Sequence, residues 1–401
     1  MKWQNKGHEF DILGETFKKN KDLLVIGNEE SLKSIKEELD FLNTKIEYKT
    51  LKDIFSIPIL SGLKLKNKTI VIADNSQETL EKLKKFKFIK YNENVFLADD
   101  FLKKYLSIYA LYVHNKMYIG TTNSVVITTN CSLNCKYCGN YQPYIKNKQH
   151  KDIDEIKKDI DIFFSCFDRV KHFSLSGGEP LLNKNIGEII EYIFDKYDKK
   201  IFRFEIPTNG SVVPSKELFD ILKNDKIYLI CGNYTKNAPH IKDSYNKLIE
   251  KCKELSINYE TPDNNNMVFF KSFPPKEDYS KYTEEQLRYR YAKCKSIYSG
   301  QEIINGKLYS CCLSANADTA NLIKSCDYDV LDLNKYYAGG GGYSKNELIE
   351  FRLDYCEKGY LEFCKYCNGF FGMENDWDEN GVTQLKRDEI LEWDINNPTY
   401  L

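Results

Sequence analysis

The sequence lacks the features that place a protein in or across a membrane. Within its 401 residues, no apolar run approaches membrane-spanning length, which is roughly 20 residues for a helix. Residues 1–8 are polar and contain no apolar core of the kind that a signal peptide carries. We therefore expect a soluble cytoplasmic protein with no membrane partner.

A charge excess is also lacking. The 58 Lys and Arg residues nearly balance the 59 Asp and Glu residues, so the overall charge provides no attraction toward nucleic acid or an acidic membrane surface. Internal repeats are absent, and a run of four glycines at 339–342 is the one low-complexity tract. We expect no nucleic-acid partner.

Cysteine, in contrast, is plentiful. The chain has 13 cysteines and no secretion signal, which indicates metal ligands and reduced thiols rather than disulfides. Three of them, Cys131, Cys135 and Cys138, form a CxxxCxxC pattern directly after an apolar run. A cubane iron–sulfur cluster with full protein ligation takes four thiolates, so a loop that supplies three leaves one iron open. A zinc site is the alternative.

A second motif follows, where the strand-like residues 173–176 end in Gly177-Gly178-Glu179. Glycines let another group approach the backbone closely, and a carboxylate at a strand end can receive a ligand ammonium. Together with the cysteine loop, this motif resembles the radical S-adenosylmethionine (SAM) superfamily. The resemblance implies a [4Fe–4S] cluster whose open iron binds SAM, with the SAM amino group facing Glu179. It implies cofactor contacts in this region, for which we select Tyr137, Ser176, Gly177, Gly178, Glu179 and Asn209, the last in a Thr-Asn-Gly turn.

The C-terminal part holds another spaced set of cysteines. Eleven residues separate Cys294 from Gly306, four more lead to Cys311, and the pair Cys364 and Cys367 follows as CxxC. Gly306 suits a hairpin turn that brings the first two thiols to one end. The pattern resembles the twitch domain, a shortened relative of the SPASM domain, which implies one auxiliary [4Fe–4S] cluster on these four thiols. A structural zinc site is again the alternative.

The centre of the chain alternates strand-like and helix-like segments. Strands are expected at 125–129, 172–176, 201–206, 227–231, 257–260 and 267–271, and helices at 153–167, 186–197, 215–222 and 245–255. This alternation indicates βα units and a parallel sheet. The resemblance implies an open (β/α)6 partial barrel, in which the fifth helix is missing or reduced because the last two strands lie so close in sequence.

Strand alternation places charges inside this barrel. In residues 201–206, Arg203 and Glu205 share one face and apolar residues share the other. Parallel strands are normally apolar on both faces, and helices cover the outside of a barrel. We therefore expect Arg203 and Glu205 to line the lumen near SAM or substrate. A buried ion pair that contacts no ligand is the alternative.

The N-terminal part resembles a small Rossmann-like α/β domain. Strands are expected at 22–27, 45–50 and 69–74, helices at 31–41 and from 77 onward, and a joining hairpin at 111–118. No second or third glycine follows Gly27, so the dinucleotide fingerprint is missing. The layout resembles α/β domains associated with nucleotide sugars in glycan assembly. We divide the chain into this domain (1–108), a radical SAM partial barrel (109–275) and a twitch domain (276–401).

These resemblances imply a reaction. A 5′-deoxyadenosyl radical from SAM would remove hydrogen from an unactivated carbon while the protein positions the substrate. We expect epimerisation of a nucleotide-linked sugar, because Cys231 ends a barrel strand where a thiol could return hydrogen from the opposite face. The alternatives are a sugar-alcohol dehydrogenase that uses the auxiliary cluster as electron acceptor, a maturase of a ribosomal peptide, and a non-catalytic electron carrier. An electron donor such as flavodoxin or ferredoxin is the implied protein partner.

Overall fold

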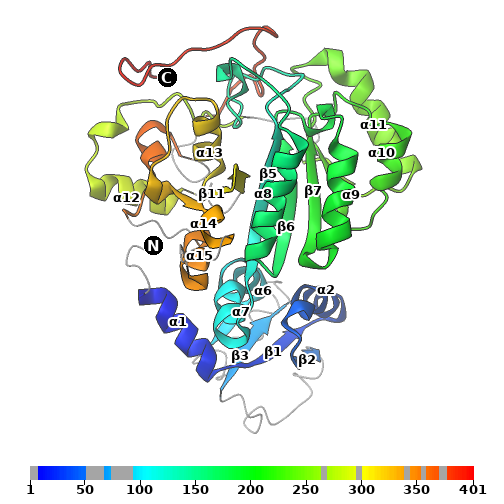
Figure 1. Cartoon of the computed structure of the whole chain (residues 1–401), viewed down its shortest axis with the longest axis vertical. Helices are drawn as coiled ribbons and strands as arrows, with labels where there is room; N and C mark the ends of the chain where they lie inside the picture. The colour runs from blue at the N-terminus through cyan, green and yellow to red at the C-terminus, as the bar shows by residue number, and fades with distance from the viewer. Residues whose placement is uncertain are drawn as a thin grey trace.

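The structure is a computed structural model of the chain. It describes residues 8–50, 67–73, 94–262, 269–294, 300–337, 344–353, 358–369 and 377–401. Two sheets, of four and eight strands, organise these residues (Figure 1). In Figure 1 the smaller sheet lies at the lower end and the larger sheet runs through the centre. Within the described ranges, no helix is both long and apolar enough to cross a membrane.

The smaller sheet has four parallel strands in the order β2-β1-β3-β4. They are β1 (Asp22–Gly27), β2 (Glu47–Thr50), β3 (Lys68–Ile72) and β4 (Val95–Leu97). Helices α1 (His8–Lys19) and α2 (Glu29–Leu39) accompany them. Strand β1 is buried from Leu23 onward, as expected for a parallel strand covered on both faces. The expected strands are confirmed with small shifts of their ends, whereas the helix expected from residue 77 lies outside the described residues.

The hairpin expected at 111–118 is wrong. A short helix, α6 (Ala98–Asp100), and a wider turn at Phe101–Tyr105 lead into α7 (Leu106–His114), a helix buried on almost every side. Asn115 ends α7 in the left-handed conformation, with φ 52°, and its N–H donates to the carbonyl of Leu111 at 2.9 Å. The polar residues that suggested a hairpin turn are therefore a helix C-cap.

The larger sheet has the order β12-β11-β10-β5-β6-β7-β8-β9, and β5 to β9 are mutually parallel. These five are β5 (Tyr118–Thr128), β6 (Arg169–Gly177), β7 (Ile201–Thr208), β8 (Ile227–Cys231) and β9 (Tyr259–Glu260). Between them lie α8 (Ile153–Cys166), α9 (Ile186–Tyr197), α10 (Lys216–Ile221) and α11 (Lys242–Glu254). The expected mixed α/β fold with a parallel sheet is confirmed.

The sixth parallel strand is not where the sequence pattern placed it. Of the expected strand 267–271, the described residues 269–271 form only an isolated bridge, between Phe270 and Trp377. Instead, β10 (Gln301–Ile304) pairs in parallel with the free edge of β5. Strands β11 (Lys307–Tyr309) and β12 (Val330–Asp332) then extend this edge in antiparallel fashion.

The C-terminal part adds helices beside this edge. They are α12 (Glu284–Lys293), α13 (Cys312–Thr319), α14 (Leu333–Tyr337) and α15 (Lys345–Arg352). A buried cluster around Phe273 and Phe363 fills the space between α12, α13 and the loop that holds Tyr141. The last residues, in red in Figure 1, cross the upper end of the molecule.

Candidate active site

A cavity of about 390 Å³ opens at the carboxyl ends of β5, β6, β7 and β8. The cysteine loop after β5 forms one wall, and the ends of the other three strands complete it. Its lining includes all three thiols of the CxxxCxxC pattern, Asn140, the Ser176-Gly177-Gly178 segment, the Pro207-Thr208-Asn209 segment, Ile230 and Tyr234. The cavity thus lies where α/β proteins with parallel strands place their ligands.

The three cysteines face this cavity from a loop that is otherwise well tied down. The Cys138 N–H donates to the Cys135 carbonyl at 3.1 Å, and the Glu179 N–H donates to the Asn130 carbonyl at 2.8 Å. Burial raises the pKa of Cys131 to about 12, and it raises the pKa of Cys135 and Cys138 as well. Because metals bind the thiolate, loading this site would release the thiol protons.

Gly177 and Gly178 are required by the protein's own backbone. A Cβ at Gly177 would collide with the carbonyl of Thr128, and a Cβ at Gly178 would collide with the carbonyl of Asn130. Gly177 also has φ +139°, which side chains rarely adopt. We expected these glycines to let a ligand approach the backbone closely. The group that approaches them is instead the backbone between β5 and the cysteine loop.

The expected role of Glu179 at the SAM amino group is not borne out by its position. Its side chain is fully buried and is not part of the cavity wall. One oxygen accepts from the Leu181 N–H at 3.1 Å, and the other accepts from the Asn209 N–H at 2.7 Å. Burial raises the pKa of Glu179 to about 7. The carboxyl group therefore joins the ends of β6 and β7 from behind the cavity.

Ser176 and Asn209 do line the cavity, whereas Tyr137 does not. The Ser176 Oγ is buried and has no hydrogen-bond partner among the described residues, which leaves it available to a ligand. The Asn209 amide nitrogen donates to Ser132 Oγ at 3.1 Å, so this side chain braces the cysteine loop. The Tyr137 ring lies 5.2 Å and 5.6 Å from the ammonium groups of Lys136 and Lys271.

Arg203 and Glu205 lie deeper along β7 and form an ion-pair network. Glu205 Oε1 is 2.8 Å from Arg203 Nε and 2.9 Å from His172 Nδ1, and Arg203 Nη1 is 2.9 Å from Glu260 Oε1. Burial opposes the charge on Glu205, but the His172 contact and the Arg203 charge hold its pKa below the usual value. Neither residue lines the cavity. The ion-pair alternative describes them better than the ligand contact that we expected.

The expected hydrogen donor, Cys231, faces away from the cavity. Along β8 the side chains of Ile227, Leu229 and Cys231 are buried on the helix-covered face, whereas Ile230 lines the cavity. The Cys231 side chain is fully buried, and burial raises its pKa to about 12. Strand alternation therefore removes this thiol from the cavity. The assignment of Cys231 as the hydrogen donor is wrong.

Sequence reasoning missed Glu302, because β10 was not expected in the barrel sheet. Register pairs Glu302 with Ser124, Ser124 with Ser174, and Ser174 with Glu205. Directly paired residues share a face of the sheet, so these four form one row across the lumen. Glu302 is only 5% exposed, and burial raises its pKa to about 8. Its Oε1 accepts from the Asn316 amide at 3.4 Å, and its Oε2 has no hydrogen-bond partner among the described residues.

The four cysteines of the second set converge on a second, smaller pocket. Cys294, Cys311, Cys364 and Cys367 all line it, together with the side chain of Arg290. The expected hairpin is confirmed: β10 and β11 pair in antiparallel fashion, with Asn305 at φ 54° and Gly306 at φ 72°. An Asn-Gly turn of this conformation suits a tight hairpin. The Arg290 guanidinium donates to the Cys367 carbonyl at 2.9 Å.

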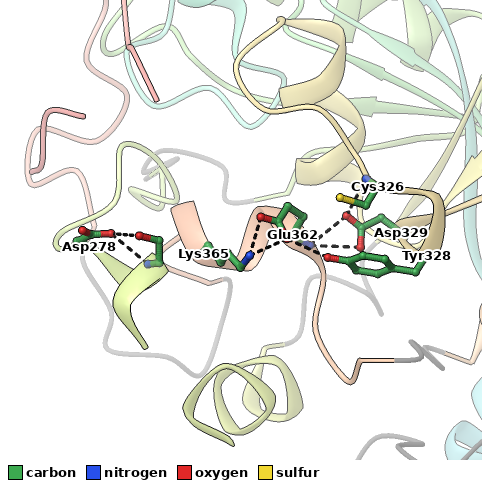
Figure 2. A network of polar contacts seen from close by, with 7 residues as sticks. Asp278, Cys326, Tyr328, Asp329, Glu362 and Lys365 are labelled. Carbon is green, nitrogen blue, oxygen red and sulfur yellow. Dashed lines mark hydrogen bonds and ion pairs between the residues drawn. The ribbon is translucent and has the colours of Figure 1, made fainter. Parts of the chain in front are cut away.

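A polar network holds the turn that carries Cys364. Figure 2 shows the Asp329 carboxylate accepting from the N–H groups of Cys326 and Glu362, the latter at 3.0 Å to Oδ2. The Glu362 side chain accepts in turn from the Tyr328 hydroxyl at 2.9 Å and from Lys365 at 2.7 Å. Burial raises the pKa of Asp329 to about 7. The network fixes the start of the Glu362–Tyr366 turn and, with it, the first cysteine of the CxxC pair.

Tyr141 and helix α13 connect the two thiol sets. The Tyr141 N–H donates to the Cys138 carbonyl at 2.9 Å, while Cys367 and Cys311 lie close enough to the Tyr141 hydroxyl to raise its pKa further than burial alone does. From helix α13, the Asn316 amide donates to the Gly139 carbonyl at 3.3 Å. The loop of the first set therefore packs directly on the helix that begins beside Cys311.

The donor set of the cavity fits a cluster with an open iron. Its described lining residues include three cysteines but no histidine, aspartate or glutamate, so the fourth ligand of a closed zinc site is missing. Across the described residues, no three His, Cys, Asp or Glu side chains are arranged to hold a single metal ion. Three thiols on one wall of a roomy cavity suit a [4Fe–4S] cluster that also binds a small molecule.

Comparisons with known proteins agree with this geometry. Residues 125–232 match the family profile described as the radical SAM superfamily. The radical SAM cyclopropyl synthase TigE of Paramaledivibacter caminithermalis is 26% identical over 180 residues, which are 40% of this chain and 37% of TigE. The uncharacterised protein MJ1285 of Methanocaldococcus jannaschii is 31% identical over 119 residues, which are 27% of this chain and 64% of that protein.

The crystal structure of BtrN in complex with AdoMet and 2-DOIA is 17% identical, with a TM-score of 0.41 over 62% of this chain and 93% of BtrN. The chain spans less than two thirds of the length of the two curated relatives, at 37% and 64%. The family match runs from β5 through all three cavity cysteines and Gly177-Gly178-Glu179 to the end of β8. The family match supports a radical SAM superfamily domain, with its [4Fe–4S] cluster and SAM, at the centre of this chain.

Proposed function

We propose that this radical SAM enzyme carries a second iron–sulfur cluster and uses it to dehydrogenate a carbohydrate substrate. The observation that carries the proposal is the position of the second thiol set, which packs with Tyr141 while Tyr141 and α13 also contact the loop of the cavity cysteines. A cluster and SAM in the cavity would supply a radical that removes hydrogen from an unactivated carbon, and a cluster on the second set would supply an electron acceptor nearby.

The described residues suggest how a polar substrate would be held. Ser176 Oγ is available at the cavity wall, and Asn140 and Thr208 line the same cavity. A polyhydroxylated ring can exchange hydrogen bonds with hydroxyl and amide groups of this kind. Apolar groups close the opposite side of the cavity, among them Ile230, Tyr234 and Phe269. A sugar or sugar alcohol suits this combination of one polar and one apolar wall.

Epimerisation of a nucleotide-linked sugar is the second candidate. It shares the cavity and the radical chemistry, but its main support was a hydrogen donor at Cys231, and that thiol faces the helices. The small parallel sheet β2-β1-β3-β4 remains a candidate for holding a nucleotide. Maturation of a ribosomal peptide is the third alternative that the sequence left open. We propose an electron donor such as flavodoxin or ferredoxin for each case.

The test uses anaerobically reconstituted protein with reductant and SAM in deuterated buffer. It is incubated with a panel of nucleotide sugars, amino sugars and sugar alcohols, and 5′-deoxyadenosine and product mass are measured. We expect one class to stimulate 5′-deoxyadenosine formation and to give a product lighter by two hydrogens. In Cys364→Ala, 5′-deoxyadenosine should still form while the oxidised product is lost. A product of unchanged mass class that has gained deuterium would instead establish epimerisation.

A further inference from the structure

A segment near the C-terminus, residues 382–391, forms part of the wall around the three cavity cysteines. The Lys136 N–H donates to the Thr383 carbonyl at 2.8 Å, and the Leu385 N–H donates to the Asn134 carbonyl at 2.9 Å. Cys135 and Gln384 face each other in this short antiparallel bridge. Figure 1 shows the segment, in red, crossing the upper end of the molecule.

Asn134 fastens the same segment a second time. Its side-chain nitrogen donates to the carbonyls of Lys386 and Glu389, each at 2.8 Å. The Leu391 N–H donates to the Pro143 carbonyl at 2.8 Å, beyond the last cysteine of the loop. Contacts therefore run along the loop from Asn134 to Pro143. The cysteine loop is held between β6 on one side and a segment far away in sequence on the other.

Within this bridge, the Gln384 side-chain nitrogen lies 3.1 Å from Cys135 Sγ. The orientation of the amide is set by its other contacts. Its oxygen accepts from the Asn134 N–H at 3.3 Å, and its nitrogen also donates to the Val382 carbonyl at 3.3 Å. If the oxygen and nitrogen of the amide were exchanged, the oxygen would face the Val382 carbonyl and the nitrogen would face the Asn134 N–H, and neither contact would be a hydrogen bond. The nitrogen therefore points its N–H at the sulfur.

We propose that residues 382–391 complete the three-cysteine site and that Gln384 is a positioning residue whose N–H···S hydrogen bond raises the reduction potential of a cluster bound there. This inference rests on the proposed radical SAM chemistry of the cavity. Hydrogen bonds to the sulfur ligands are among the factors that set iron–sulfur potentials. A donor withdraws negative charge from the thiolate and so favours the reduced, more negative cluster. Second-layer contacts of this kind also orient the ligand.

The test is a redox titration followed by electron paramagnetic resonance (EPR) on the reconstituted full chain. The cluster with the open iron is identified as the one whose signal changes when SAM is added. Gln384→Met keeps the length of the side chain and removes the donor, so we expect a lower midpoint potential with the iron content unchanged. Asp388→Asn, an exposed change on the same segment, is the matched control and should leave the potential in place.

A second measurement on the unmodified chain does not depend on how the variant folds. With glutamine labelled with ¹⁵N only at the side-chain amide, pulsed EPR should detect a weak nitrogen coupling to the SAM-responsive cluster, because the backbone N–H of Gln142, which contacts Cys138, stays unlabelled. An unchanged potential in Gln384→Met, or no such coupling in the parent chain, would overturn the role of Gln384. Failure to form any SAM-responsive cluster on the three cysteines would instead refute the proposed function itself.

Discussion

Glu179 and Glu302 are both buried carboxyl groups next to the candidate active site, but their surroundings differ. Glu179 accepts two backbone N–H groups, one of them at 2.7 Å. Glu302 accepts a single side-chain amide at 3.4 Å and leaves its second oxygen without a hydrogen-bond partner among the described residues. A buried carboxylate with so few hydrogen-bond donors around it is unfavourable. The pKa of Glu302 is therefore raised, and the group keeps its proton. Glu302 is therefore the carboxyl group best prepared to give or take a proton in the lumen.

This difference predicts a pH-dependent effect of Glu302→Gln. Burial raises the pKa of Glu302 from 4.5 to about 8, so the folded chain holds a proton there that the unfolded chain has lost. The parent chain should lose stability relative to the variant as the pH rises from 4.5 to 8, by up to about 1.4 kcal/mol per pH unit. Urea unfolding at several pH values measures this difference. The exposed change Glu250→Gln serves as the control, and a pH-independent difference for Glu302→Gln would contradict the prediction.

At the scale of elements, the end of β6 positions the cysteine loop. Gly178 donates its N–H to the Thr128 carbonyl at 2.9 Å, and the backbone at Asn130 lies directly against it. The tight contact ties the strand that carries the Gly-Gly-Glu motif to the strand that leads into the thiols. Small side chains are thus needed at this strand end for a structural reason, beside any contact with SAM.

Gly178→Ala should therefore disturb the first thiol set. The added methyl group would collide with the Asn130 carbonyl and touch Cys131, so the loop must shift. We expect reduced iron retention on the first set and a destabilisation of about 1–3 kcal/mol, as for other overpacked sites. Gly139→Ala on the same loop is the matched control, because its Cβ would meet only Leu313 at an ordinary 3.6 Å. Equal iron content in the two variants would argue against this role of Gly178.

The elements that could be predicted from the sequence are those that local patterns define. Helix α9 and strand β8 were predicted with the bounds that the structure shows. An amphipathic repeat indicates the helix, and a short apolar run indicates the strand. Two cysteine spacings likewise identified the two thiol sets. Partners brought in from far along the chain could not be predicted. Strand β10 beside β5 and Gln384 beside Cys135 depend on tertiary packing that no local pattern encodes.

The facing direction of single side chains was harder to predict. Cys231 was expected at the cavity because it ends a barrel strand. The preceding residue, Ile230, lines the cavity instead. The sequence shows that side chains alternate between the two faces of β8. It does not show which of the two alternating sets faces the cavity. For Arg203 and Glu205 the shared face was predicted, whereas their mutual pairing with His172 and Glu260 needed the neighbouring strands.

For the whole molecule, the two thiol sets belong to different buried cores. The first set packs in a small cluster with Leu133, Ala238, Ile241 and Val382, and the second lies within the cluster around Phe273 and Phe363. We therefore expect the two sets to take up metal separately. Replacing Cys131, Cys135 and Cys138 together by Ala should leave roughly half of the iron, since two cubane clusters would each contain four irons.

The same triple variant should lose reductive cleavage of SAM completely. Iron analysis and chromatography of 5′-deoxyadenosine measure the two outcomes. The reverse variant, with Cys364 and Cys367 replaced, is the control and should retain SAM cleavage. SAM cleavage in the triple variant would show that the cavity cysteines are not the site of the open cluster.

The pairing of β10 with β5 has a consequence for biosynthesis of the chain. Strand β5 emerges from the ribosome early, but the partner for its second edge, β10, follows only after β6, β7, β8 and β9. Until then, the backbone of β5 at Asn123–Val125 has no strand partner on this side, and an unpaired strand edge is the kind of surface that promotes aggregation. Expression at lower temperature or with a chaperone should therefore raise the yield of intact protein. Fragments that end before residue 300 should accumulate as insoluble material.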